Sequence, residues 1–502
     1  MFRFTQVAGR EFCLVITVEK PAENIMDSNT DYERYDGLGL AGLVKDGSVS
    51  AAELLEAAIE RVEQRNPAIN AVVDRMYDQA KAAIAAGLPS GPFSGVPYLL
   101  KDSGPLYAGT VTTFGSSAFR TFIPDQDSEM VTRLKRAGLV IFGKTHSPEF
   151  GLCSSSESRL FGATHNPWNL EYSAGGSSGG SAAAIASGMV PAAYGSDGGG
   201  SIRIPASCCG LFGLKPTRAR TPVGPDAGEW WNGMAIAHAI ARSVRDSAAL
   251  LDATAGAEIG DPYWAPPPKR SYQAEVGTHP GTLRIAFTAR PWRIHEVDSE
   301  CVDAVDEAAK LCEDLGHHVE EASPEIDESV FEKAIWIIIT AQTHALLQRA
   351  TPVLGRPATS EDVETVTWAY RESARQFSAS DYAEAITAVH RAGRVVGRFF
   401  TGYDILMTPT MCTPPHKLGE VSMMRTDIEA FRDIVRGDVA FTQLFNASGN
   451  PAMSVPLHWS ADGLPVGVQF AAQFGDEAML FRLAAQLESA QPWTNRRPAQ
   501  TY

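Results

Sequence analysis

Two glycine- and serine-rich segments, separated by a short apolar run, restrict the fold of this chain more than any other feature. The first reads SAGGSSGGSAAAIASGM over residues 173–189, and the second reads GSDGGGSIRIP over residues 195–205. A flexible linker joins separate folded units, whereas the first segment continues without polar spacing into an apolar run of helical character. Because glycine permits positive φ angles and close backbone approach, both segments are candidates for backbone held close to a reacting group.

The first segment also matches the pattern of a nucleophile elbow. Gly175, Ser177 and Gly179 fit G-x-S-x-G, which requires a strand before the serine and a helix after it. The helix is plausible, but the residues before the pattern, HNPWNLEYSA over 165–174, contain a proline and two asparagines. We therefore expect no strand there, which argues against an elbow.

The second segment offers a different chemistry. Three glycines precede Ser201, and the backbone N–H groups of Gly198, Gly199, Gly200 and Ser201 can converge on one point. Such a group of donors is an oxyanion hole, and Ser201 then stands where a nucleophile is needed. A serine hydroxyl is a weak nucleophile unless another group accepts its proton.

The residues alone leave the identity of that proton acceptor open. The nearby histidines stand in no recognisable triad context: His146, His165 and His238. No lysine follows a serine by three positions, as the S-x-x-K arrangement requires. Lys101 ends the apolar run GVPYLL, where burial lowers the pKa of a lysine and favours the neutral amine. A buried ion pair between Lys101 and Asp102 is the alternative.

Apolar runs of strand length alternate with helical patterns along the chain, which indicates an α/β fold. Ser50 and Glu53 form a capping box for a helix that Asn66-Pro67 is expected to end. Residues 299–400 are predicted to be mainly helical, with a break at PVLGRPATS. The remaining predicted elements are strands at 95–100, 139–145, 283–289, 404–410, 453–457 and 466–472 and helices at 128–138 and 477–489.

Charge and cysteine content narrow the class of protein. A net charge of −16 argues against nucleic acid and anionic membranes as partners, because both require clustered Lys and Arg. The 7 cysteines show no zinc-type spacing, so we expect free thiols in a reducing compartment and no metal. No apolar run approaches about 18 residues, so we expect no membrane-spanning segment, and the N-terminal patch FCLVITV lacks the pattern of a signal peptide. A cytoplasmic protein is predicted, with a poorly ordered N-terminal extension over residues 1–29.

Taken together, these motifs resemble the amidase signature family. The block from Gly175 to Thr217 fits that family, as do GVPYLLKD, GKTHSPEFG, LFGATHNPW and NASGNPAMSVP, and the similarity extends from about residue 35 to about residue 500. The resemblance implies a large central mixed β-sheet covered by helices on both faces. It further implies that residues 30–502 form a single amidase signature domain, in which 299–400 are a mainly helical variable region.

The resemblance also assigns roles to individual residues. Ser201 falls on the family's nucleophile, Lys101 on its general base and Ser177 on a bridging serine whose preceding peptide bond is cis. The N–H groups of residues 198–201 would hold the oxyanion. Gly198 replaces the common Thr or Ile, and His146 replaces the common Asn, and neither change removes a member of this Ser-Ser-Lys triad.

From this resemblance we expect a bacterial hydrolase that cleaves uncharged, fairly apolar amides through an acyl-enzyme and needs no cofactor. Aryl or alkyl amides, anilides and cyclic amides are the expected substrates, with carbamates and esters as further ones. Within the family, four segments look most like bacterial hydrolases of cyclic amide dimers: SGPFSGVPYLLKD, GATHNPWNL, ARSVRDSAALLD and LESAQPWTNRRP. The oligomeric state stays open, with a homodimer as one option.

Residues outside the motifs are expected to select the substrate. Cys153 and Ser154 stand at a family position beside the bridging serine. Trp230 and Trp231 lie in the glycine-bounded loop AGEWWNG, which is a poor place to bury two indoles, so we expect them in the substrate pocket. Trp336, in the apolar run AIWIIIT, is expected to pack in the core.

Two other functions stay open. An amidotransferase subunit shares this fold but works with partner subunits and passes ammonia to a charged tRNA, and the acidic charge argues mildly against it. A non-catalytic binding protein on the same scaffold is the second, and the intact set of Lys101, Ser177 and Ser201 argues against it.

Overall fold

A single large β-sheet carries the residues that the motifs singled out. The computed structural model describes residues 29–293 and 295–499, so the predicted N-terminal extension lies outside the described residues except for Asn29. In the described part, 11 strands form one mixed sheet. In spatial order these strands are β1 (Val72–Arg75), β3 (Val140–Thr145), β2 (Pro97–Lys101), β8 (Ala192–Asp197), β10 (Ile236–Ala241), β9 (Phe212–Lys215), β14 (Ala452–Trp459), β15 (Pro465–Ala472), β13 (Ile405–Pro409), β11 (Arg284–Phe287) and β12 (His318–Glu321).

Strand direction changes across this sheet. Strand β2 runs parallel to both β3 and β8, whereas the pairs from β8 through β10, β9, β14 and β15 to β13 are antiparallel. Strands β13, β11 and β12 are again parallel. Side chains along β2, β3 and β13 are all buried, as expected for strands covered on both faces. The α/β architecture expected from the sequence is confirmed.

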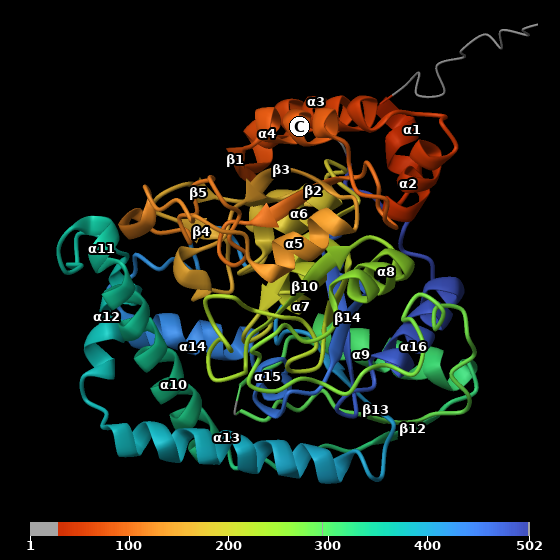
Figure 1. Cartoon of the computed structure of the whole chain (residues 1–502). Coiled ribbons are helices and arrows are strands. Elements are labelled where there is room, and N and C mark those ends of the chain that lie inside the picture. The colour runs from red at the N-terminus through yellow and green to blue at the C-terminus, as the bar shows by residue number, and fades with distance from the viewer. Residues whose placement is uncertain (1–28, 294, 500–502) are drawn as a thin grey trace, which may run out of the picture.

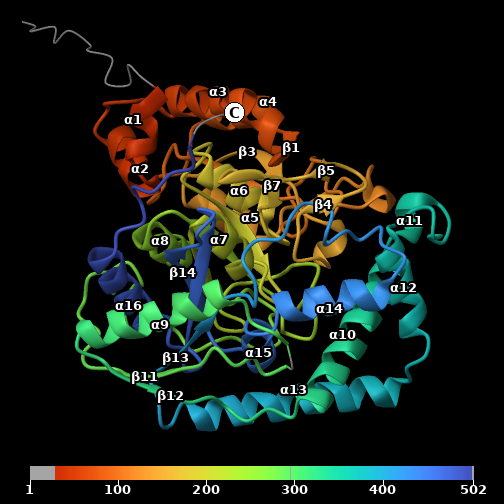
Figure 2. The same cartoon turned by 180° about the vertical axis from the view of Figure 1, so that it is seen from behind.

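Helices surround the sheet (Figures 1 and 2). Helices α10, α12 and α13 are grouped at the end of the molecule opposite α3 and α4 in both views. The helices, including the short 3-10 helices η1 and η2, are α1 (Asn29–Arg34), α2 (Gly37–Lys45), α3 (Ala51–Ile69), α4 (Tyr77–Ala86), η1 (Ser117–Phe119), α5 (Glu129–Arg136), η2 (Glu149–Gly151), α6 (Gly179–Ala186), α7 (Arg203–Cys209), α8 (Val244–Thr254), α9 (Ser299–Asp314), α10 (Glu328–Arg349), α11 (Thr351–Leu354), α12 (Thr365–Ala374), α13 (Ala379–Phe399), α14 (Ile428–Asp438), α15 (Gln443–Ser448) and α16 (Glu477–Ala490).

The start of helix α3 confirms a local prediction, and its end corrects one. Ser50 and Glu53 form the predicted capping box, in which Glu53 N–H donates to Ser50 Oγ at 3.1 Å. The helix does not stop at Asn66-Pro67 but continues to Ile69 and ends at Asn70, whose φ is 54°. The Asn66 carboxamide oxygen accepts the N–H groups of Ala71 and Val72 at 2.8 Å, so the side chain organises the turn that follows the helix.

A second correction concerns the residues before Ser177. Strands β6 (His165–Asn166) and β7 (Asn169–Ser173) form a separate two-stranded sheet, where no strand was expected. This hairpin turns at Pro167, which is why a proline is compatible with it. Three residues separate β7 from Ser177, and β7 is not part of the large sheet. A nucleophile elbow requires a strand that leads directly into the serine, and the described residues contain no such strand before Ser177.

One helical stretch among the described residues, Glu328–Leu354, is long and apolar enough to cross a bilayer, judged by length and composition alone. Of its most apolar segment of 18 residues, 44% is buried in the protein. The sequence analysis predicts no membrane-spanning segment, whereas this helix meets the criterion of length and composition. Polar residues such as Thr340, Gln342 and His344 interrupt its apolar residues.

Within this stretch Trp336 stacks under the guanidinium of Arg432 at 3.8 Å and meets the Tyr370 ring edge-on at 4.8 Å. Trp336 therefore packs between helices against a core cluster but is only partly buried, whereas the sequence predicted a core position.

Candidate active site

The candidate site lies where two parallel neighbours, β2 and β8, leave the sheet at the same edge. Lys101 is the last residue of β2 and Asp197 is the last residue of β8. Residues 198–202 connect β8 to helix α7, and Ser178 immediately precedes helix α6. In this way two strand ends and the starts of two helices bring the three motifs together.

Lys101 is fully buried and contacts Ser177, a residue 76 positions away in the sequence. Its Nζ donates to Ser177 Oγ at 2.7 Å and to Ser196 Oγ at 3.0 Å. Burial lowers the pKa of Lys101 from 10.5 to about 7, against the opposing charge of Asp197. A substantial fraction of the amine is therefore neutral near pH 7.

The alternative of an ion pair between Lys101 and Asp102 finds no support. The Asp102 carboxylate is bound instead by Thr113, whose Oγ1 donates at 2.5 Å and whose N–H donates at 3.1 Å, and by Gly115 N–H at 3.0 Å. These three donors come from the loop that follows β2. Asp102 thus fixes that loop beside the lysine.

Ser177 follows a cis peptide bond, Gly176–Ser177, as the family resemblance implied. The glycine before it is required by packing, because a Cβ atom on Gly176 would lie 2.7 Å from the carbonyl oxygen of Cys153. The segment that contains Cys153 and Ser154 therefore lies directly against the peptide that carries Ser177.

A buried ion pair supports the loop that leads to Ser201. The Asp197 carboxylate meets the Arg203 guanidinium at 2.8 Å, and both side chains are inaccessible to solvent. Burial alone would raise the pKa of Asp197, but Arg203 and a hydrogen bond from Asn446 hold it at about 2. Sequence reasoning missed this network, although two opposite charges within GSDGGGSIR are a signal for it.

The glycines of this loop are also set by close packing. Gly200 has φ of 142°, and a Cβ atom there would lie 2.6 Å from Thr442 Oγ1. Thr442 Oγ1 in turn donates to the Gly199 carbonyl at 2.5 Å. A Cβ on Gly198 would lie 3.0 Å from the indole of Trp231, so the glycine at this position leaves room for the tryptophan.

A cavity of about 510 Å³ opens above these residues. It brings together the predicted site residues Lys101, Ser177, Gly198, Gly199, Ser201, Cys153, Ser154, Trp230 and Trp231. Gly200 is not among the lining residues. Trp230 and Trp231 thus lie in the pocket wall, as the sequence suggested.

Much of the remaining wall is aromatic or aliphatic. Phe114, Phe119, Phe122 and Phe150 pack against one another at centroid distances from 5.2 to 6.2 Å and line one side. Helix α10 contributes further lining residues, including Ile339 and Leu346. Sequence patterns do not reveal these aromatic residues, because they lie in loops and in η1 and η2 rather than in periodic elements.

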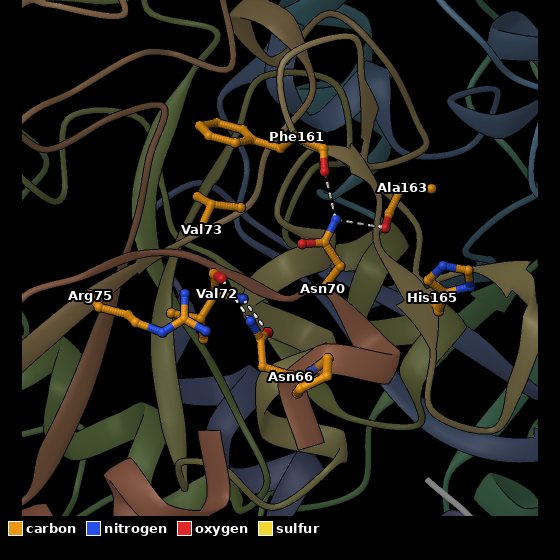
Figure 3. A pocket seen from close by; sticks show the side chains of 9 residues that line it. Asn66, Asn70, Val72, Val73, Arg75, Phe161, Ala163 and His165 are labelled. Carbon is orange, nitrogen blue, oxygen red and sulfur yellow. Dashed lines mark hydrogen bonds between the residues drawn. The ribbon is translucent and has the colours of Figure 1, made fainter. Parts of the chain in front are cut away.

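A second cavity, of about 470 Å³, lies beside the end of α3 (Figure 3). Its amide side chains are already used within the protein: Asn70 Nδ2 donates to the carbonyls of Phe161 and Ala163, and Asn66 Nδ2 donates to Val72. His165 Nδ1 lies 2.7 Å from the Leu170 carbonyl. These contacts assign the residues to local structure rather than to ligand binding.

Comparison with known proteins identifies the class to which this fold and site belong. The family model Amidase matches residues 53–481, and the chain belongs to this family. The chain is 40% identical over 475 residues to the 6-aminohexanoate-cyclic-dimer hydrolase of Paenarthrobacter ureafaciens, with 92% of this chain and 96% of that protein covered. It is 37% identical over 487 residues to the putative amidase AmiB2 of Mycobacterium tuberculosis strain H37Rv, with 94% and 99% covered.

Solved structures agree with this assignment. A structure of 6-aminohexanoate cyclic dimer hydrolase complexed with substrate superposes with a TM-score of 0.89 at 39% identity, covering 93% of this chain and 99% of that one. A bacterial aryl acylamidase of the amidase signature family superposes with a TM-score of 0.84 at 27% identity, covering 92% and 97%. The amidase signature fold and an amide-hydrolysing activity are thereby confirmed.

Proposed function

We propose that the protein hydrolyses uncharged, fairly apolar amides with Lys101, Ser177 and Ser201 as its catalytic residues. The observation that carries this proposal is the fully buried Lys101 amine, 2.7 Å from Ser177 Oγ, in a cavity that Ser201 also lines. The wall is mostly apolar, although Asp226, Glu229 and Arg349 also line the cavity. The apolar part supports the choice of uncharged substrates, because burying an unpaired charge against it would be costly.

In the proposed reaction, neutral Lys101 accepts the Ser177 proton while Ser177 Oγ takes the proton of Ser201. Ser201 Oγ forms a bond to the substrate carbonyl carbon, and the carbonyl oxygen becomes an oxyanion. The N–H groups of residues 198–201 are proposed to stabilise that charge.

The carbon–nitrogen bond then breaks, and the proton held by the lysine returns through Ser177 to the leaving nitrogen. This leaves an ester between the acyl group and Ser201. Water attacks this ester through the same relay, releases the carboxylic acid and restores the Ser201 hydroxyl.

For the substrate itself, we propose aryl or alkyl amides, anilides or cyclic amides, with carbamates and esters as further substrates. Two relatives support this range, since one is named as a hydrolase of a cyclic amide dimer and another as an aryl acylamidase. Trp230, Trp231, Cys153 and Ser154 are the proposed substrate-binding residues. A turnover screen of these substrate classes on the purified protein tests the assignment.

The catalytic roles are tested by labelling and substitution. A fluorophosphonate should modify Ser201, and peptide mass spectrometry should locate the adduct there. Ser201→Ala should lower kcat by at least about 10³-fold. Ser177→Ala should also lower kcat severely, but by less than Ser201→Ala. An active Ser201→Ala variant together with an inactive Ser177→Ala variant would instead favour Ser177 as the nucleophile.

The two other functions make different predictions. The chain also resembles one component of the glutamyl-tRNA(Gln) amidotransferase of Thermotoga maritima, with a TM-score of 0.74 at 27% identity. Glutaminase activity that appears only with copurified partner proteins would support that function. Failure of the fluorophosphonate to react would support a non-catalytic binding protein.

We propose that the protein is cytoplasmic and that residues 30–502 form a single domain. For the assembly we propose either a monomer or a homodimer. The six cysteines among the described residues are all free and buried, which suits a reducing compartment. Sedimentation velocity of the purified protein measures the assembly state directly.

A further inference from the structure

We infer that Ser154, held by Asp438 and His416, accepts the N–H of the amide bond that is cleaved and so makes the site selective for amides over esters. This inference rests on the proposed function and adds to it a hydrogen bond to the leaving nitrogen. It follows from the hydrogen-bond partners of one short segment, Cys153–Ser156.

The three serines of this segment have different surroundings. Ser155 Oγ donates to Glu157 at 2.7 Å and lies 2.7 Å from Ser173 Oγ. Ser156 Oγ donates to the Gly175 carbonyl at 3.0 Å. Neither of these two serines lines the cavity, whereas Ser154 does.

The hydroxyl proton of Ser154 is already committed. Ser154 Oγ donates to Asp438 Oδ2 at 2.5 Å, and the other carboxylate oxygen of Asp438 lies 2.7 Å from His416 Nε2. Asp438 is 1% exposed. A carboxylate only accepts hydrogen bonds, so the direction of the Ser154 bond is fixed.

His416 keeps the carboxylate in place. Burial by itself would lower the pKa of His416, but Asp438 and Glu420 raise it above its ordinary value, which favours the charged imidazolium. The His416 carbonyl also accepts the backbone N–H of Ser173 at 2.8 Å. The pair thus joins helix α14 to the segment around Ser154.

Ser154 lines the cavity and its hydroxyl proton is used, so a lone pair that its oxygen directs into the cavity can only accept a hydrogen bond. It therefore accepts a donor and does not provide one. An amide nitrogen that bears hydrogen supplies such a donor, and an ester oxygen does not. This difference is the physical basis of the inferred selectivity.

The backbone of Ser154 lies close to the residue that is proposed to protonate the leaving nitrogen. The carbonyl carbon of Ser154 lies 2.8 Å from the place of a Cβ on Gly176, so this segment packs against the peptide that carries Ser177. In the proposed reaction Ser177 returns a proton to the leaving nitrogen, which must then lie beside it. The inferred contact requires the remaining hydrogen on that nitrogen to point toward the Ser154 oxygen.

The test compares two substrates with the same acyl group, hexanoyl 4-nitroanilide and 4-nitrophenyl hexanoate. Ser154→Ala should lower kcat/KM for the anilide about tenfold more than for the ester, the effect of one neutral hydrogen bond. Ser154→Thr keeps the hydroxyl and should retain the wild-type ratio. Asp438→Asn should shift the ratio in the same direction as Ser154→Ala, because the hydroxyl is then free to rotate.

Ser155→Ala is the matched control, since it removes a hydroxyl of the same segment that does not line the cavity. It should change both substrates in parallel. Equal losses for anilide and ester in Ser154→Ala would overturn the inference while leaving the proposed hydrolase intact. A wild-type protein that turns over neither substrate and no other amide of the screen would overturn both.

Discussion

Replacing Lys101 by methionine should abolish amide hydrolysis and at the same time make the protein more stable. The side chain is fully buried, and its pKa of about 7 lies well below the ordinary value of 10.5. Folding at pH 7 must therefore weaken the proton binding of an amine that is fully charged in the unfolded chain, which costs about 4 kcal/mol. A methionine of similar size has no such cost.

The gain is reduced by the contacts that the lysine makes. Lys101 has two hydrogen bonds, to Ser177 and Ser196, each worth about 1 kcal/mol. The net increase in the free energy of unfolding at pH 7 is thus expected to be about 2 kcal/mol.

The stability difference should depend on pH with a defined sign. Between pH 7 and 10.5 the unfolded chain binds more protons than the folded one, so wild-type stability rises with pH in this window. The advantage of Lys101→Met should therefore be largest at pH 7 and below and should shrink as the pH approaches 10.5. Urea unfolding of both proteins at pH 7 and at about pH 9.5 measures the difference.

Activity provides a second measurement on the same residue. Because the base must be neutral, wild-type kcat/KM should rise about tenfold per pH unit below 7 and level off above it. Lys144→Met, which removes another buried lysine on the neighbouring strand β3, should keep that rise. The reasoning is refuted if Lys101→Met is less stable than wild type by the same amount at both pH values, or if it keeps the rise in rate.

Three further outcomes follow from the same structure. Arg203→Met leaves the buried carboxylate of Asp197 unpaired and should destabilise the protein by about 3–5 kcal/mol, measured by urea unfolding, and a loss below about 1 kcal/mol would contradict the buried pair. Gly198→Ala places a Cβ 3.0 Å from the indole of Trp231, so kcat/KM for bulky anilides should fall more than for small aliphatic amides, and an unchanged ratio would speak against Trp231 in the pocket. Burial, together with a neighbouring carboxylate, raises the pKa of Glu364 from 4.5 to about 8, so between these pH values the folded protein binds a proton that the unfolded chain has lost. The free energy of unfolding should therefore fall as pH rises through this window. Glu364→Gln should remove that fall, and parallel stability curves of variant and wild type from pH 5 to 9 would count against it.

The sequence by itself indicated the α/β architecture and, through the resemblance of its motifs, the family and the candidate residues Lys101, Ser177 and Ser201. These are local signals, because apolar periodicity marks strands and helices and because glycine runs mark places of close backbone approach. The capping box at Ser50 is local in the same sense, and the structure confirms it.

Local signals failed where side chains act at the ends of elements. Asn66-Pro67 is expected to stop a helix, yet the Asn66 carboxamide binds the backbone beyond it and the helix runs on to Ile69. The hairpin before Ser177 is a second failure of local signals. Pro167 argues against a strand, but it lies in the turn of the hairpin and not within a strand.

Only the tertiary structure decided what surrounds the site. Ser154 and Asp438 are 284 residues apart, and Arg203 and Asn446 are 243 apart, so no pattern along the chain relates them. The aromatic wall of the cavity likewise comes from loops and short helices without periodicity. The lowered pKa of Lys101 belongs to this group too, because the amine is buried only when distant segments pack around it.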